Sequence, residues 1–100
     1  MIVVAGHLTI DPAQRDKALD AIRTAVAMTR QEPGNLDYRF SPDLDDSNRF
    51  NIIERWENEE TMNEHMGSPH LADFLTIIGG CLSGPPEVIR YDVARSQPLF

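Results

Sequence analysis

Apolar and polar residues alternate with a period of two in four segments of the chain, the first of which is residues 2–10, "IVVAGHLTI". If this segment is a strand, one of its faces carries Ile2, Val4, Leu8 and Ile10, with Gly6 among them. The other face carries Val3, Ala5, His7 and Thr9. Because both faces are largely apolar, we expect this strand to be buried on both sides.

A helical period follows at Asp11-Pro12. Asp11 suits the N-cap, Pro12 suits the first helical position, and Gln14 completes a capping-box pattern. The expected buried stripe is formed by Leu19, Ile22 and Val26, flanked by Ala18, Ala25 and Thr29. Pro33-Gly34 requires the helix to end near Gln31.

Residues 35–43 and 49–57 predict two strands of a hairpin, because the stretch "PDLDDSN" between them has the composition of a turn. In the second of these strands, alternation places four residues on one face: Phe50, Ile52, Glu54 and Trp56.

Two shorter helices and a last strand complete the chain. Asn58 can cap a helix that ends at Gly67, and Ser68-Pro69 begins another that ends at Gly79-Gly80. The buried stripe of the latter is Leu71, Phe74, Leu75 and Ile78. Residues 87–95 form the last strand, and residues 95–100 are a tail.

The order of these elements, β-α-β-β-α-β, predicts the α+β class and a ferredoxin-like sandwich in a single domain, residues 1–100. The first and third strands should be central neighbours, and the helices should cover one face of the sheet. The apolar second face of the first strand also needs a cover, and a second copy of the chain would supply it. We therefore expect a homodimer.

Composition narrows the function classes. The chain of 100 residues is 41% apolar and 25% charged, as in ordinary globular domains, and its net charge of −7 is spread without a basic run. Nucleic-acid and anionic-membrane binding both need clustered Lys and Arg, so neither is expected. The single cysteine, Cys81, forms no internal disulfide, and the apolar run "IVVAG" is too short to span a membrane. We expect a cytoplasmic protein.

Trp56 and His65 are the first candidate site residues, because the indole ends a strand and the imidazole follows on a short helix. Met62 shares the helical face of His65, so an aromatic wall, a thioether and a titratable ring could line one pocket. Each has a structural alternative. Trp56 could be a core anchor, and His65 could be an exposed helix residue or a partner of the helix dipole.

Three other polar residues have open roles. His7 could be a hydrogen-bonded core histidine or could orient an anion, and His70 is expected to be solvated in the first turn of a helix. Glu54 stands between apolar residues of a central strand and needs a partner, for which Arg39 or Arg90 is the expected answer.

Residues 32–74, "EPGNLDYRFSPDLDDSNRFNIIERWENEETMNEHMGSPHLADF", closely resemble the antibiotic biosynthesis monooxygenase domain family. The features are "EPG" before a strand, "NRF" opening and "ERW" ending the next strand, His65, and "SPH". The resemblance implies a homodimer whose sheets pack face to face as a dimeric α+β barrel, with a pocket in each protomer. Some relatives oxidise quinols or polycyclic phenols without metal or flavin; others degrade haem or isomerise small phosphorylated compounds.

The family's functional residues transfer only in part. By the motifs, haem-degrading relatives have an asparagine, a tryptophan and an axial histidine where this chain has His7, His65 and Leu75. The missing axial histidine argues against haem degradation. Phenol-oxidising relatives have a tryptophan at Trp56 but an asparagine at the position of Ile52, so their polar substrate contacts are not reproduced.

The predicted function is a monooxygenase that uses neither cofactor nor metal and oxidises a small quinol or phenolic aromatic with O₂. His65 would be the base, Trp56 would stack on the ring and donate its N–H, and His7 would orient the anion. The apolar substrate contacts would come from Met62, Phe74, Ile52 and Phe50. Two alternatives are a small-molecule binding or isomerase module without oxygenase activity, and a bare dimerisation domain.

Overall fold

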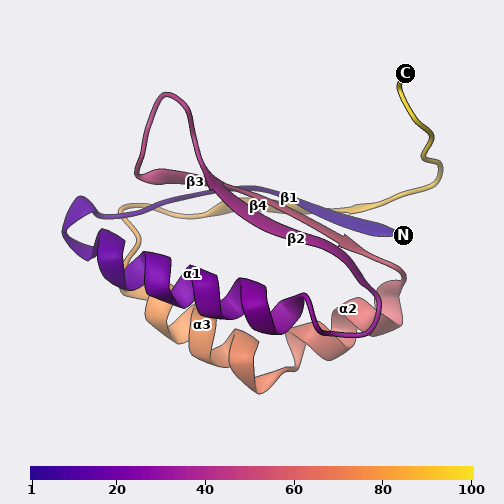
Figure 1. Ribbon diagram of the computed structural model, residues 1–100, viewed down its shortest axis with the longest axis horizontal. Coiled ribbons are helices and arrows are strands. Elements are labelled where there is room, and N and C mark those ends of the chain that lie inside the picture. The colour runs from indigo at the N-terminus through magenta and orange to yellow at the C-terminus, as the bar shows by residue number, and fades with distance from the viewer.

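The computed structural model describes residues 1–100 and shows a four-stranded antiparallel sheet with all its helices on one face (Figure 1). In chain order the elements are β1 (Ile2–Thr9), a 3₁₀ turn (Pro12–Gln14), α1 (Arg15–Thr29), β2 (Asn35–Pro42), β3 (Arg49–Trp56), α2 (Glu59–Met66), α3 (Pro69–Gly79) and β4 (Glu87–Asp92). The strand order β2-β3-β1-β4 makes β1 and β3 the central pair. The predicted ferredoxin-like α+β fold is therefore confirmed.

The expected element bounds hold to within three residues, and the start of α1 differs for a physical reason. Asp11 does accept a hydrogen bond, but from the backbone of Ala13 at 3.0 Å, and it caps a 3₁₀ turn rather than the α-helix. Gln14 makes no capping bond, so the predicted capping box is wrong. A box does form at α2, where Asn58 and Thr61 each bond the other's backbone.

The core lies between the inner face of the sheet and the helices. The buried residues of the larger cluster include Leu8 on β1, Ile10 just after β1, Phe50 on β3, and Phe74 on α3. On α1 the predicted Ile22 is buried in the core together with Ala18, Ala21 and Ala25, whereas Leu19 and Val26 are half-buried at its margins.

The turn from α1 into β2 is held against the beginning of α2. Gly34 has φ +81°, a backbone conformation that favours glycine, and a Cβ there would collide with the side chain of Thr61. The Gly34 carbonyl also accepts a hydrogen bond from the backbone of Glu57 at 2.8 Å. These contacts fix the position of Glu32, two residues earlier, relative to α2.

The outer face of the sheet has no helix over it (Figure 1). On this face the β1 residues Val3 and Ala5 are half-buried, and Ile89 and Tyr91 of β4 are 56% and 50% exposed. The tail beyond β4 extends away from the sheet, with Leu99 and Phe100 exposed. None of the helices is both long enough and apolar enough to cross a bilayer.

Candidate functional site

A pocket of about 420 Å³ lies between the inner face of the sheet and helices α2 and α3. Most of its lining is apolar, including Tyr38, Phe40, Ile52, Met62, Phe74 and Ile78. Only three strongly polar side chains reach it: Glu54, His65 and Arg90. An apolar cavity with a few convergent polar groups is the usual form of a small-molecule site.

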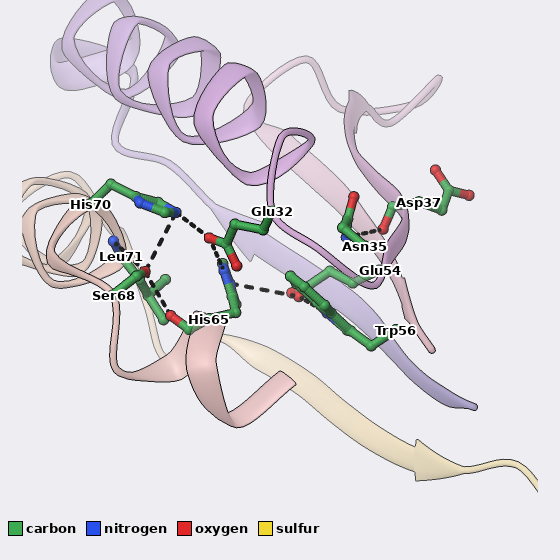
Figure 2. A network of polar contacts seen from close by, with 9 residues as sticks. All are labelled: Glu32, Asn35, Asp37, Glu54, Trp56, His65, Ser68, His70 and Leu71. Atoms are coloured by element: carbon green, nitrogen blue, oxygen red, sulfur yellow. Dashed lines mark hydrogen bonds and ion pairs between the residues drawn. The ribbon is translucent and has the colours of Figure 1, made fainter. Parts of the chain in front are cut away.

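His65 lies in the last turn of α2, and its side chain is only 2% exposed. Its Nδ1 is 3.0 Å from Oε1 of Glu32, and its Nε2 is 4.0 Å from Oε1 of Glu54 (Figure 2). The ring also packs against the Trp56 indole, with centroids 4.6 Å apart, and edge-on against Tyr38 at 5.5 Å. Two carboxylates and two aromatic rings therefore surround one imidazole.

Glu32 lies in the turn between α1 and β2, where its backbone N–H donates to the Thr29 carbonyl at 3.0 Å. Its Oε1 contacts both His65 and His70, and Figure 2 shows the carboxylate between the two rings. Ser68 connects the two helices: its hydroxyl donates to the His65 carbonyl at 2.7 Å and lies 3.4 Å from Nε2 of His70. The predicted solvation of His70 is wrong, because its side chain is only 15% exposed.

Glu54 finds its partners on its own strand and on α2. The Trp56 indole N–H donates to Glu54 Oε1 at 3.0 Å. Burial raises the pKa of the Glu54 carboxyl, and the bond from Trp56 and the charge of His65 offset only part of that rise. The expected arginine partners are wrong, since Arg39 pairs with Asp37 at 2.7 Å and Arg90 with Asp92 at 2.8 Å.

The raised pKa of Glu54 has a consequence for stability. The ionised carboxylate is less favourable in the folded than in the unfolded chain. The contribution of Glu54 to the free energy of unfolding should therefore be largest when the pH is below its ordinary pKa of 4.5. This contribution should decline as the pH rises from 4.5 through the higher pKa of the folded protein. We expect Glu54→Gln to remove this decline, so that the variant gains stability relative to the parent across that window. Urea unfolding at a series of pH values measures this difference, and a constant difference would contradict it.

Tyr38 adds a phenol that the sequence analysis did not select. Its side chain is 2% exposed, lines the pocket and lies edge-on to His65. Burial, and secondly the charge of Glu54, raise the pKa of Tyr38 well above its ordinary value. The phenol therefore stays neutral at physiological pH and remains a hydrogen-bond donor.

The structure brings together some of the predicted site residues and separates others. His65, Met62, Phe74 and Ile52 all line the pocket. Trp56 does not, because its side chain is completely buried behind His65 and its N–H is already bonded to Glu54. Its predicted stacking on a substrate ring therefore does not fit this arrangement.

Two other predicted residues lie elsewhere. Phe50 lies in the core and does not line the pocket. The guanidinium carbon of Arg15 lies over the Phe50 ring, 5.5 Å from the ring centre. His7 lies on the outer face of the sheet, with Nδ1 3.0 Å from Arg49 and Nε2 3.3 Å from Glu87. It cannot orient an anion in the pocket of its own protomer.

Sequence reasoning did not assign site roles to Glu32, Tyr38, His70 and Arg90. Glu32 and His70 stand in the segments "EPG" and "SPH", which carried the family resemblance, and an acid before a tight Pro-Gly turn was the available signal. Tyr38 was recognisable only as an inward-facing strand residue, and Arg90 as a possible partner of Glu54.

The donor atoms of Glu32, His65 and His70 all lie within 4.8 Å of one another, close enough for a set that could hold a metal ion. Two hydrogen bonds to one carboxylate oxygen account for the same spacing. An acceptor-only carboxylate between two ring N–H groups is satisfied by those bonds alone. We therefore describe the three residues as a hydrogen-bonded cluster.

The chain folds as an α+β sandwich with a mostly apolar pocket and a buried carboxylate–histidine cluster. The family model for antibiotic biosynthesis monooxygenase matches residues 1–76, and the chain belongs to this family. The "Putative monooxygenase YcnE" of Bacillus subtilis is 28% identical over 95% of this chain and 100% of that protein. An uncharacterized protein of Synechocystis, sll1783, is 30% identical over 98% of this chain and 67% of its own length.

Solved structures agree on the fold. A "putative antibiotic biosynthesis monooxygenase" from Deinococcus radiodurans superposes with a TM-score of 0.90 at 23% identity, covering 100% of this chain and 99% of that one. At this identity the likeness establishes the arrangement of elements and leaves the chemistry to the site residues.

Proposed function

We propose that the protein is a monooxygenase that oxidises a quinol or phenolic aromatic with O₂ and draws all the electrons from its substrate. The observation that carries this proposal is His65 in an apolar pocket, with Nδ1 bonded to Glu32 and Nε2 directed toward the pocket-lining Glu54. Family membership and the name of the Bacillus relative support the reaction class.

The first step is removal of a proton from the substrate hydroxyl by Nε2 of His65. A carboxylate only accepts hydrogen bonds, so Glu32 requires the proton of a neutral His65 to sit on Nδ1, which leaves Nε2 with a free lone pair. The anion produced is electron-rich enough to reduce O₂. A hydroquinone and O₂ then give a hydroxyquinone and water, which balances atoms and electrons without a further reductant.

Two groups can stabilise the anion. Arg90 lines the pocket from β4, where its Nε and Nη2 are bonded to Glu59 and Asp92, and its Nη1 would be the hydrogen-bond donor to the anion. The neutral Tyr38 phenol is a possible hydrogen-bond donor. Donors placed where charge develops are the main electrostatic device of such sites. These two replace Trp56 and His7, the donors expected from the sequence.

The experiment is oxygen uptake with a panel of hydroquinones, using chelator-treated, flavin-free protein and heat-denatured protein as the autoxidation control. With ¹⁸O₂, the oxygenase should place one labelled atom in the product. Uptake that forms only unlabelled quinone would indicate an oxidase, and absence of enzyme-dependent uptake across the panel would refute the proposal.

A second candidate function is an isomerase on the same pocket. It is favoured by the 4.0 Å separation of His65 Nε2 and Glu54 Oε1, because two titratable groups side by side can take a proton from one atom and return it to another. Ligand binding without oxygen uptake, accompanied by deuterium exchange into the ligand from D₂O, would support it.

We further propose that two protomers pack through the outer faces of their sheets, as the dimeric barrel predicted from sequence requires. The support is the apolar content of that face, which includes Val3, Ala5, Ile53, Ile89 and Tyr91. An exposed apolar patch of this kind is typical of an interaction surface.

The protein should therefore sediment as a homodimer at micromolar concentration. Ile53→Glu places a charge at the centre of the outer face, opposite Ala5, and should yield monomers. The matched control is Ile77→Glu on α3, an exposed isoleucine on the helical side, which should leave the dimer intact. A parent protein that sediments as a single monomeric species would contradict the proposal.

A further inference from the structure

Glu32 connects two histidines that open onto different cavities. His65 lines the inner pocket under the sheet. His70 instead lines a groove of about 400 Å³ between α1 and α3, beside Asp20 and Asp73. Glu32 itself lines neither cavity. Its side chain is 16% exposed, and its carboxylate lies between the two rings, as Figure 2 shows.

The hydrogen-bond geometry fixes the direction of both bonds. Both ring nitrogens face the same atom, Oε1 of Glu32, which as a carboxylate oxygen can only accept. His65 must therefore donate from Nδ1 and His70 from Nε2. The first bond holds the His65 ring in the tautomer whose Nε2 can act as a base. The second holds the carboxylate in place from the opposite side.

We propose that Glu32 is the positioning residue of His65 and that His70 is the anchor of Glu32, an inference that rests on the proposed base function of His65. Glu32 selects the His65 tautomer before the reaction and lies beside the imidazolium after proton transfer, so its negative charge favours that state. His70 contributes by restraining the carboxylate. Neither residue touches the substrate.

The charged and titratable groups around His65 are few. Glu32 faces His65 from the turn before β2, and Glu54 faces it from β3. His70 lies on α3, with the centre of its ring 6.0 Å from the centre of the His65 ring. Tyr38 approaches from β2. Only Glu32 is bonded to a His65 nitrogen, so the tautomer depends on this one residue.

Two substitutions separate the hydrogen bond from the charge. Glu32→Gln removes the charge but keeps an acceptor oxygen, whereas Glu32→Met keeps the approximate size and removes both. We expect kcat to fall in both, and by about 10²–10⁴-fold in Glu32→Met, where the upper figure is the loss that follows when the carboxylate partner of the histidine is changed in a hydrolase triad. KM should stay unchanged because Glu32 does not line the pocket.

His70 provides a graded test of the anchor. His70→Gln keeps an N–H that can reach Glu32, whereas His70→Ala removes it, so the loss of kcat should be smaller in Gln than in Ala. The matched control for charge is Glu64→Gln, an exposed acid next to His65 in sequence, which should leave kcat unchanged. Equal losses in the two His70 variants would overturn the anchoring role.

A readout without substrate distinguishes this inference from the proposed function. Long-range ¹H–¹⁵N spectra of the imidazole rings should show His65 as the Nδ1–H tautomer in the parent and in Glu32→Gln, and as a mixture or the Nε2–H tautomer in Glu32→Met. If this pattern appears but no substrate is oxidised, the positioning role stands and the monooxygenase proposal fails. Two results would overturn the positioning role whatever the activity: an Nε2–H tautomer of His65 in the parent, or an Nδ1–H tautomer that persists in Glu32→Met.

Discussion

Replacing His65 by glutamine should lower turnover about 10²–10⁴-fold, the usual contribution of a positioned base, while the fold and the proposed dimer persist. The glutamine amide can still donate to Glu32 but cannot accept a proton at physiological pH. Alanine is the poorer choice, because His65 is buried and its removal would leave a cavity between Glu32 and Glu54 and remove one partner from each.

Initial rates of oxygen uptake, circular dichroism and sedimentation together measure this effect. His7→Gln makes the same change on the outer face of the sheet and therefore compares the two histidines proposed from the sequence. An equal loss in both variants would place the chemistry outside this pocket. Parental uptake in a folded His65→Gln protein would eliminate His65 as the base, and Glu54, the neighbouring titratable group of the pocket, would be tested next.

Replacing Trp56 by alanine should cost about 3–5 kcal/mol of unfolding free energy, as large aromatic truncations in cores do. The indole is completely buried, packs on His65 and provides the N–H bonded to Glu54, so truncation leaves a cavity and removes the hydrogen-bond donor of Glu54. Trp56→Phe should cost less, since it retains part of the ring volume but loses the N–H.

Urea unfolding followed by far-ultraviolet circular dichroism is the suitable measurement, because Trp56 is the only tryptophan and its fluorescence disappears with it. Leu44→Ala, in the exposed loop between β2 and β3, is the control and should stay within about 0.5 kcal/mol of the parent. A loss below about 1 kcal/mol for Trp56→Ala would show that the surrounding residues close the cavity.

The fold was predictable because period-two and helical patterns report which face of each element is buried. Ile52 and Phe74 were placed correctly in the pocket by this means, since both point inward from their elements. Trp56 shares the face of Ile52, yet the sequence could not show that α2 and the turn before β2 cover the end of that strand. The prediction that His7 orients an anion in the pocket rests on the chemistry of imidazole alone. The alternation of β1 already assigns His7 to the face opposite to the pocket.

The carboxylate–histidine cluster could not be derived from the sequence for a different reason. Glu32 and His65 are 33 positions apart, and no local pattern reports a contact at that distance. His70 was judged by its place in the first turn of a helix, where solvation is common. Ser68 and the turn at Gly34 bring these side chains together, and both act through tertiary contacts.

This assembly also determines how the cluster responds to unfolding. Glu32 comes from a turn, Glu54 from β3, His65 from α2 and His70 from α3, so the cluster exists only when all of these elements are docked. Partial opening at any one of them separates His65 from its partners. The cluster is therefore lost when any one of these elements opens, and amide exchange near His65 should report the element that opens at the lowest free energy.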